Sequence, residues 1–278
     1  MVKNTLDIFG YEGKTVVISG AASGMAKSAA ELLINLGAKV YAIDLHDIDL
    51  PVEKKFKGDL SQQATIDAIC AELPQKIDAL FLCHGMAAWP GKEIKVQLVN
   101  FLGQKYMIEK LLPRVVDNGS VSLISSVGGF GWQDMIKECM EVINFTTWEE
   151  TVSWYEAHPA LILSSYTFSK QCLNTYVKSR AHTPQYTERR IRLNAICPGD
   201  TLTGLSDDFA ITTTGDKESG AAAVEMVFLS SWKGRPAQPQ EMGYPLAAIG
   251  SKIFSYMSGQ TIYIDYGLSA HWEVDSIT

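Results

Sequence analysis

Short runs of apolar residues alternate along the chain with longer stretches that have helical periodicity. The first run, residues 14–20, is rich in β-branched residues and ends in glycine, and residues 21–36 follow with apolar positions on one helix face. Similar apolar runs lie at 38–44, 79–83, 119–125, 192–197 and 260–265. Strands that are apolar throughout are typical of a parallel sheet covered by helices on both faces. The pattern predicts an α/β fold with a doubly wound, mostly parallel sheet, in a single domain over 1–278.

Composition narrows the class of protein. The chain of 278 residues is 46% hydrophobic, its mean hydropathy is +0.02 and its net charge is −7, values typical of a globular protein. The 24 basic residues form no dense block, so nucleic acid is not an expected partner. No apolar run of about eighteen residues and no secretory leader is seen, which predicts a cytoplasmic protein without a membrane partner.

The five cysteines show no metal-site spacing. They are scattered along the chain without a CxxC pair and without the paired cysteine and histidine spacings that zinc sites use. We therefore expect buried thiols and no metal centre. Cys83 is of interest because it precedes His84 at a predicted strand end, although a structural role is the usual one for such a cysteine.

A glycine-containing turn lies between the first predicted strand and helix. It reads Gly20-Ala21-Ala22-Ser23-Gly24-Met25-Ala26. Backbone N–H groups and the positive end of the helix dipole meet at such a turn, which suits a phosphate group. The candidate contacts are Gly20, Ser23, Gly24 and Met25. Glycines also serve tight turns that bind no ligand, so the turn alone leaves both interpretations open.

Asp44 indicates which cofactor the turn would hold. It ends the second predicted strand about twenty residues beyond the turn, where a carboxylate can bind both ribose hydroxyls of a dinucleotide and repel a 2′-phosphate. Positions 23 and 45 hold serine and leucine, and neither residue is a base that could pair with that phosphate. We predict NAD, with NADP disfavoured. The alternative is a solvated acid at a strand end.

A tyrosine and a lysine form a candidate catalytic pair. Tyr166 and Lys170 are four positions apart and so lie on one face of a predicted helix, where the ammonium group can stabilise the ionised phenol. Tyr166 could then exchange a proton with an alcohol or a ketone. The same spacing also arises on half-exposed helices with a snorkelling lysine.

Taken together and in order, the motifs of this chain resemble those of the short-chain dehydrogenase/reductase family over nearly the whole length. The matching motifs are Gly20-x-x-x-Gly24-x-Ala26, Asp59-Leu60, Cys83-His84-Gly85, Asn100, Ile124-Ser125-Ser126, Tyr166-x-x-x-Lys170, Pro198-Gly199 and Asp265-Tyr266-Gly267. The resemblance implies a Rossmann-type fold. It also implies hydride transfer between a nicotinamide cofactor and an alcohol or ketone carbon.

The same resemblance implies roles for individual residues. Tyr166, Lys170, Ser126 and Asn100 would be catalytic: Ser126 would hold the substrate oxygen beside Tyr166, Lys170 would also bind the nicotinamide ribose, and Asn100 would support a proton relay. The remaining cofactor contacts would be Asp59 and Leu60 at the adenine, Gly85 at the adenosine ribose, and Thr201 and Thr203 at the nicotinamide end. The alternatives are structural: Asn100 could cap a helix or a turn, and Thr201 and Thr203 could be ordinary loop residues.

The chain departs from the family pattern in three places. Alanine at position 26 replaces a usual glycine, a change that adds one methyl group. Cys83-His84-Gly85 replaces Asn-Ala-Gly, which leaves the contacts of that asparagine unassigned; His84 could lie near the cofactor, or be packed or at the surface. Tyr166 follows Ser126 by 40 positions, longer than in the commonest members, so an insertion lies at about 128–163.

Two interpretations of the insertion remain open. Its aromatic residues could form a wall for a bulky apolar substrate, or they could form an oligomer surface that replaces or blocks the helix contacts usual in the family. This insertion is similar to that of the bacterial 3α-hydroxysteroid dehydrogenase/carbonyl reductase subgroup, which implies a hydroxysteroid, a bile acid or another hydrophobic secondary alcohol or ketone. Residues of about 202–236 lack clear periodicity and are predicted to form a substrate-covering loop.

Several functions are consistent with these residues. The first is an NAD-linked hydroxysteroid dehydrogenase, and the second is a dehydrogenase or carbonyl reductase for smaller apolar, terpenoid or aromatic alcohols. A third is a regulator that keeps the fold and the cofactor without chemistry. We expect a homodimer or homotetramer.

Overall fold

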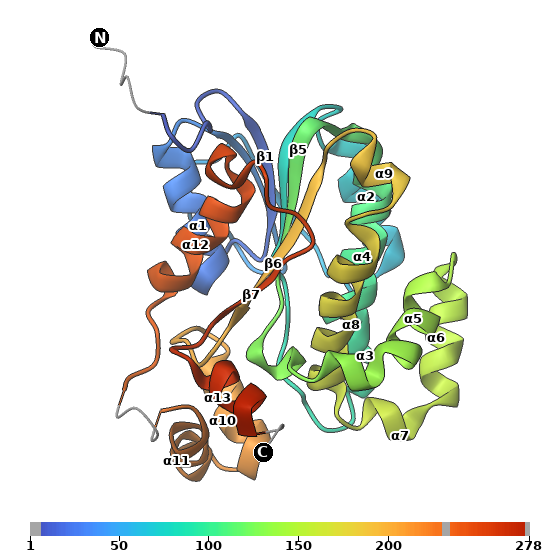
Figure 1. The fold of residues 1–278 in the computed structure, drawn as a ribbon, viewed down its shortest axis with the longest axis vertical. Helices are drawn as coiled ribbons and strands as arrows, with labels where there is room; N and C mark the ends of the chain where they lie inside the picture. The colour runs from blue at the N-terminus through green and yellow to red at the C-terminus, as the bar shows by residue number, and fades with distance from the viewer. Residues whose placement is uncertain (1–6, 230–233, 276–278) are drawn as a thin grey trace.

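A seven-stranded parallel sheet with helices on both faces forms the centre of the protein (Figure 1). The computed structural model describes residues 7–229 and 234–275. The strands lie in the order β3-β2-β1-β4-β5-β6-β7. Their bounds are β1 Thr15–Ser19, β2 Lys39–Asp44, β3 Lys54–Lys57, β4 Ile77–Leu82, β5 Val115–Ile124, β6 Arg192–Pro198 and β7 Thr261–Ile264. The predicted doubly wound single domain is confirmed.

The helices occupy both faces of this sheet and one end of the molecule. Their bounds are α1 Gly24–Asn35, α2 Gln63–Glu72, α3 Glu93–Gln97, α4 Gly103–Leu111, α5 Ile136–Asn144, α6 Trp148–Ala157, α7 Pro159–Ile162, α8 Ser165–Arg180, α9 Pro184–Thr187, α10 Ser206–Thr214, α11 Lys217–Phe228, α12 Pro239–Gly250 and α13 Leu268–Asp275. Helices α1 and α12 cover one face, while α2, α4 and α8 cover the other (Figure 1).

Successive residues of the central strands enter different halves of the core. Val16 and Ile18 of β1 pack with Leu33 of α1 and Leu246 of α12, whereas Val17 belongs to the cluster on the α4 and α8 face. Because side chains alternate along a strand, a strand covered on both sides must be apolar at consecutive positions. This explains why apolar runs, rather than alternating patterns, mark the sheet.

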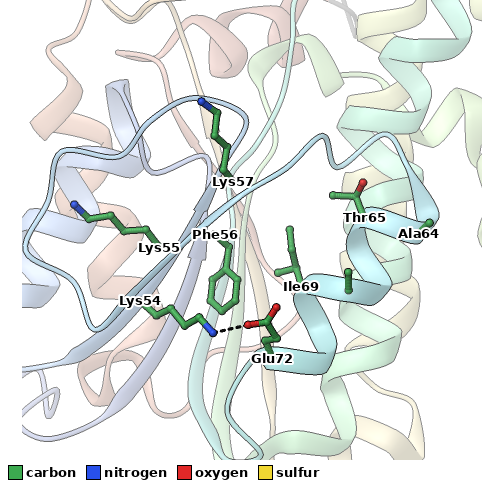
Figure 2. A pocket seen from close by; sticks show the side chains of 9 residues that line it. Lys54, Lys55, Phe56, Lys57, Ala64, Thr65, Ile69 and Glu72 are labelled. Atoms are coloured by element: carbon green, nitrogen blue, oxygen red, sulfur yellow. Dashed lines mark hydrogen bonds and ion pairs between the residues drawn. The ribbon is translucent and has the colours of Figure 1, made fainter.

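The short edge strand β3 is absent from the sequence prediction. Three of its four residues are lysines, so no apolar run marks it. In the groove between β3 and α2, Lys54 pairs with Glu72 at 2.5 Å and its ammonium lies 4.8 Å from the centre of the Phe56 ring (Figure 2). Lysines on an edge strand discourage pairing with another chain. This groove contains none of the predicted site residues.

The insertion folds into three helices, α5, α6 and α7, which lie beside α8 (Figure 1). Thr147 and Glu150 form a capping box that starts α6. Trp154 of α6 is buried and stacks on Phe168 of α8, with 5.9 Å between ring centres and 14° between planes. In α5, the Cys139 Sγ lies 3.7 Å from the Cys172 Sγ of α8. The insertion therefore extends the hydrophobic core over the outer side of α8.

The region predicted as a substrate-covering loop is largely helical. Helices α10 and α11 fill most of it, and they gather with α13 at one end of the molecule (Figure 1). Periodicity gave little sign of them because small and polar residues predominate, as in Thr212-Thr213-Thr214. Residues 230–233 of the predicted loop lie outside the described residues.

Candidate active site

The predicted site residues follow the carboxyl ends of different strands. Because all seven strands are parallel, these ends share one edge of the sheet, the usual ligand edge of such folds. Gly20 follows β1, Asp44 ends β2, Gly85 follows β4, Ser126 follows β5, and Thr201 follows β6. The topology thus brings distant parts of the sequence to one edge.

The turn after β1 has a backbone that requires glycine. Gly20 and Gly24 have φ of 76° and 58°, in the left-handed region. A Cβ on Gly20 would lie 3.0 Å from the Cys83 backbone, and one on Gly24 would lie 3.2 Å from the Thr203 side chain. Met25 sits in the first turn of α1, and the exposed Ser23 precedes it without a side-chain capping bond among the described residues. The start of α1 therefore keeps its N–H groups for a ligand.

Asp44 lies directly beside this turn. One carboxylate oxygen accepts from the Ala22 N–H at 2.9 Å, and the other accepts from the His46 N–H at 2.8 Å. The carboxylate thus joins the end of β2 to the turn. Each oxygen also has a second lone pair, so these bonds leave capacity for ribose hydroxyls.

Tyr166, Lys170 and Ser126 meet between α8 and the end of β5. The Lys170 ammonium donates to the Ile124 carbonyl at 3.0 Å and lies 5.5 Å from the centre of the Tyr166 ring. The Tyr166 ring and the Ser126 hydroxyl both lie against Gly128, and Ser126 lowers the pKa of the phenol. Ser126 Oγ also accepts from the Gly128 N–H at 3.0 Å, which fixes the serine at the start of a 3₁₀ turn.

Burial controls the protonation of this pair. It raises the pKa of Tyr166 to about 12, against the lowering effect of the Ser126 hydroxyl. It lowers the pKa of Lys170 to about 8. The expected lowering of the phenol pKa by Lys170 is therefore not seen in the protein by itself, because desolvation favours the neutral form of each group.

Asn100 lies in a π-helical turn, Leu98–Leu102, at the start of α4. Its amide oxygen accepts from the Met86 N–H at 2.8 Å, and its amide nitrogen donates to the Met86 carbonyl at 3.0 Å and to Ser169 Oγ at 3.3 Å. A Cβ on Gly85 would lie 3.3 Å from the Asn100 amide oxygen and 3.8 Å from Lys170 Nζ. Asn100, Gly85 and Lys170 therefore share one small region, and π-helical turns are frequent at functional sites.

His84 is buried beneath the glycine turn, a position that the sequence left open. Its Nδ1 lies 2.7 Å from Ser19 Oγ, which also accepts from the Cys83 N–H at 3.1 Å. The His84 carbonyl accepts from the Gln104 side chain at 2.8 Å. Burial lowers the pKa of His84 to about 3, with Lys170 adding to the effect, and burial raises the pKa of the Cys83 thiol. Both residues are neutral and join the ends of β1 and β4.

The remaining predicted residues flank the same edge. Asp59 accepts from the Ser61 N–H at 2.9 Å and from Lys95 at 3.2 Å, and Leu60 is buried beside it. Thr201 Oγ1 donates to the Gly199 carbonyl at 3.1 Å, and Thr203 Oγ1 accepts from the Leu205 N–H at 3.2 Å. Both threonines thus order the segment that leads into α10.

A dinucleotide fits these residues. A cradle with glycines at positions 20, 24 and 85, where a Cβ would crowd neighbouring atoms, lies between an uncapped helix start and the Asp44 carboxylate. Such a surface admits a pyrophosphate and two riboses. Among the described residues, no group of three or more potential ligands could hold a metal ion.

Comparison with known proteins identifies the family. The chain matches the family model described as enoyl-(acyl carrier protein) reductase over residues 20–269. It is 27% identical over 257 residues to a coniferyl-alcohol dehydrogenase of Pseudomonas sp. (strain HR199 / DSM 7063), covering 92% of this chain and 97% of that protein. The chain belongs to the short-chain dehydrogenase/reductase family, which confirms the resemblance seen in the sequence.

Other relatives are also oxidoreductases. The chain is 26% identical over 260 residues to a 3-alpha-hydroxysteroid dehydrogenase/carbonyl reductase of Comamonas testosteroni, covering 92% of this chain and 96% of that protein. Its fold is similar to that of a 3-alpha-hydroxysteroid dehydrogenase from Pseudomonas sp. B-0831 solved with NADH, with a TM-score of 0.76, 20% identity, and 94% and 98% of the two chains covered.

Within the part of the chain that the structure describes, no helix has the length and apolar character needed to cross a bilayer.

Proposed function

We propose that this oxidoreductase transfers a hydride between NAD(H) and the carbinol or carbonyl carbon of a hydrophobic substrate. The observation that carries the proposal is the meeting of Tyr166, Lys170 and Ser126 at the sheet edge that also holds the glycine turn and Asp44. This reaction requires an acid/base at the substrate oxygen and a nicotinamide at the carbon that bears this oxygen.

Each catalytic residue has a role that its contacts support. Tyr166 exchanges the proton of the substrate oxygen, and Ser126 holds that oxygen through its hydroxyl. Lys170 supplies positive charge near the phenol and binds the nicotinamide ribose. Asn100, beside Gly85 and Lys170, is placed to support proton exchange with solvent. The bound nicotinamide supplies or takes the hydride.

The cofactor contacts are proposed at the residues predicted from the sequence. They are Gly20, Ser23, Gly24 and Met25 for the pyrophosphate, Asp44 for the adenosine ribose hydroxyls, Asp59, Leu60 and Gly85 for the adenosine, and Thr201, Thr203, Tyr166 and Lys170 for the nicotinamide half. The choice of NAD over NADP rests on Asp44, since a carboxylate repels a 2′-phosphate.

A hydroxysteroid or bile acid remains the first substrate proposal. Similarity to the 3-alpha-hydroxysteroid dehydrogenase/carbonyl reductase supports it. An aromatic alcohol is the second proposal. Similarity to the coniferyl-alcohol dehydrogenase supports it, together with the Phe209 ring that contacts Tyr166. We also propose a homodimer or homotetramer, which sedimentation equilibrium would test.

Turnover with defined substrates tests the proposal. Purified protein with NAD should produce NADH from at least one member of a panel of hydroxysteroids, bile acids and aryl carbinols, and the same panel with NADP should react more slowly. Reaction of an aryl carbinol but of no steroid would reject the steroid proposal. Cofactor binding without any turnover in either direction would instead favour a regulator that keeps only the fold.

A further inference from the structure

A glycine and an aromatic ring bound the space around the catalytic tyrosine. At Gly128, a Cβ would lie 3.2 Å from Cε1 of Tyr166 and 3.4 Å from Ser126 Oγ, so the glycine lets the backbone pack closely against both side chains. Phe209 of α10 contacts Tyr166 edge to face, with 4.9 Å between ring centres and 83° between planes. The Phe209 ring therefore presents an aromatic surface beside the Tyr166 side chain.

Phe209 is held by a helical hairpin. Helices α10 and α11 approach so closely that a Cβ on Gly220 would overlap the Ala210 carbonyl oxygen at 1.8 Å. Lys217 of α11 pairs with Asp207 of α10 at 2.6 Å. Because main-chain packing joins the two helices, the hairpin positions the Phe209 ring as one unit, and the exposed ion pair adds little.

The start of the hairpin is also fixed. Ser206 Oγ donates to the Thr201 carbonyl at 3.1 Å and accepts from the Thr203 N–H at 2.9 Å. The Thr203 side chain in turn lies beside Gly24 of the glycine turn. The ring thus sits on a segment that is anchored close to the proposed cofactor site.

An aromatic wall distinguishes between apolar substrates by shape and by charge distribution. Aromatic rings prefer edge-to-face or offset contacts with other rings, and such pairs are stabilised beyond the area that they bury. A saturated ring of the same carbon number is thicker and has no ring quadrupole.

We propose that Phe209 is a specificity-determining residue that selects alcohols or ketones with an aromatic ring attached to, or conjugated with, the reacting carbon. This inference rests on the proposed oxidoreductase function and favours its second substrate proposal, the aromatic alcohol, over the steroid. It assigns the selection to a contact of the ring with the substrate, whereas the proton chemistry stays with Tyr166.

A matched pair of alcohols tests the inference. 1-Phenylethanol and 1-cyclohexylethanol have the same reacting group and carbon count, and differ in the aromaticity of the ring. The ratio of their kcat/KM values is measured in the wild type and in Phe209→Leu, Phe209→Tyr and Lys217→Met. Intrinsic reactivity of the two alcohols cancels when the ratio is compared between proteins.

The expected change is a loss of aryl preference in Phe209→Leu, by about three- to tenfold relative to the wild-type ratio. Phe209→Tyr keeps the ring and should keep the ratio, and Lys217→Met, which disturbs the hairpin elsewhere, should keep it as well. Melting curves establish that each variant is folded. An unchanged ratio in Phe209→Leu, or an equal loss in Lys217→Met, would overturn the inference while leaving the oxidoreductase proposal intact. No turnover of either alcohol or of the wider panel by the wild type would overturn both.

Discussion

At the scale of single residues, burial acts on the proposed catalytic pair, Tyr166 and Lys170, in opposite directions. It raises the pKa of Tyr166 to about 12 and lowers that of Lys170 to about 8. At neutral pH the phenol therefore keeps its proton, the form that a donor to a carbonyl oxygen requires. Lys170 stays charged below its pKa, so the pair combines a proton donor with a nearby positive charge.

His84 is a second residue whose protonation is set by its surroundings. Its folded pKa of about 3 lies below the ordinary value of 6.5. Between these two pH values, the unfolded chain therefore binds a proton at this histidine that the folded chain does not bind. Stability from neutral His84 is complete above pH 6.5 and is lost as the pH falls toward 3. The loss should reach about 2 kcal/mol at pH 5.

His84→Ala should remove this pH dependence. At pH 7.5 the variant should be less stable than the wild type by about 1–2 kcal/mol, because the bond to Ser19 is lost. Between pH 7.5 and 5 its free energy of unfolding should fall less than that of the wild type, as measured by urea titration. Replacement of the exposed His182 by Ala is the control and should keep the wild-type slope. Equal slopes for His84→Ala and wild type would contradict a neutral buried His84.

At the scale of elements, the end of β2 and the glycine turn act together. Asp44 binds the Ala22 N–H, so the carboxylate has a structural contact as well as a proposed cofactor contact. Asp44→Ala should therefore weaken both NADH and NADPH through the turn, and NADH further through the lost ribose contact. Dissociation constants of NADH and NADPH, measured by protein fluorescence, would separate the two effects. The loss through the turn is the same for both cofactors and cancels in their ratio, whereas the loss of the ribose contact changes the ratio. A ratio of the two constants that does not move toward NADPH would count against Asp44 as the ribose ligand.

The insertion is an element whose apolar residues serve the core. Trp154 is buried, stacks on Phe168 and donates to the Glu141 carboxylate at 3.0 Å. Trp154→Ala should lower the free energy of unfolding by about 3–5 kcal/mol, as expected for removal of a large buried ring. Trp148, which is only partly buried and contacts Tyr106, offers a milder comparison as Trp148→Ala. A loss below about 1 kcal/mol for Trp154→Ala would mean that the insertion is not part of the core.

At the scale of the whole molecule, the parallel sheet explains how the sequence could predict so much of the site. Apolar runs identified six strands, and parallel strands place their carboxyl ends together, so Ser126, Asp44 and Gly20 converge once the fold is known. Tyr166 and Lys170 follow from helical spacing. These features depend on local patterns that repeat across the chain.

Other features depend on contacts between distant segments and could not be predicted. The edge strand β3 is rich in lysine, so no apolar pattern marks it in the sequence. It forms because its backbone pairs with β2. The Ser19–His84 bond joins residues 65 positions apart. The ring of Phe209 meets Tyr166 only because the α10–α11 hairpin packs in one particular way. The periodicity of apolar residues along the sequence carries no information on such long-range contacts.

Replacement of Tyr166 by Phe tests the central claim most directly. The change removes one hydroxyl from a side chain that is placed beside Ser126 and Lys170. With NAD and the best alcohol of the panel, the account predicts a fall in kcat of at least about a hundredfold. The melting temperature should stay close to the wild-type value, and NADH should still bind through its other proposed contacts. Wild-type turnover by the folded Tyr166→Phe protein would contradict the account.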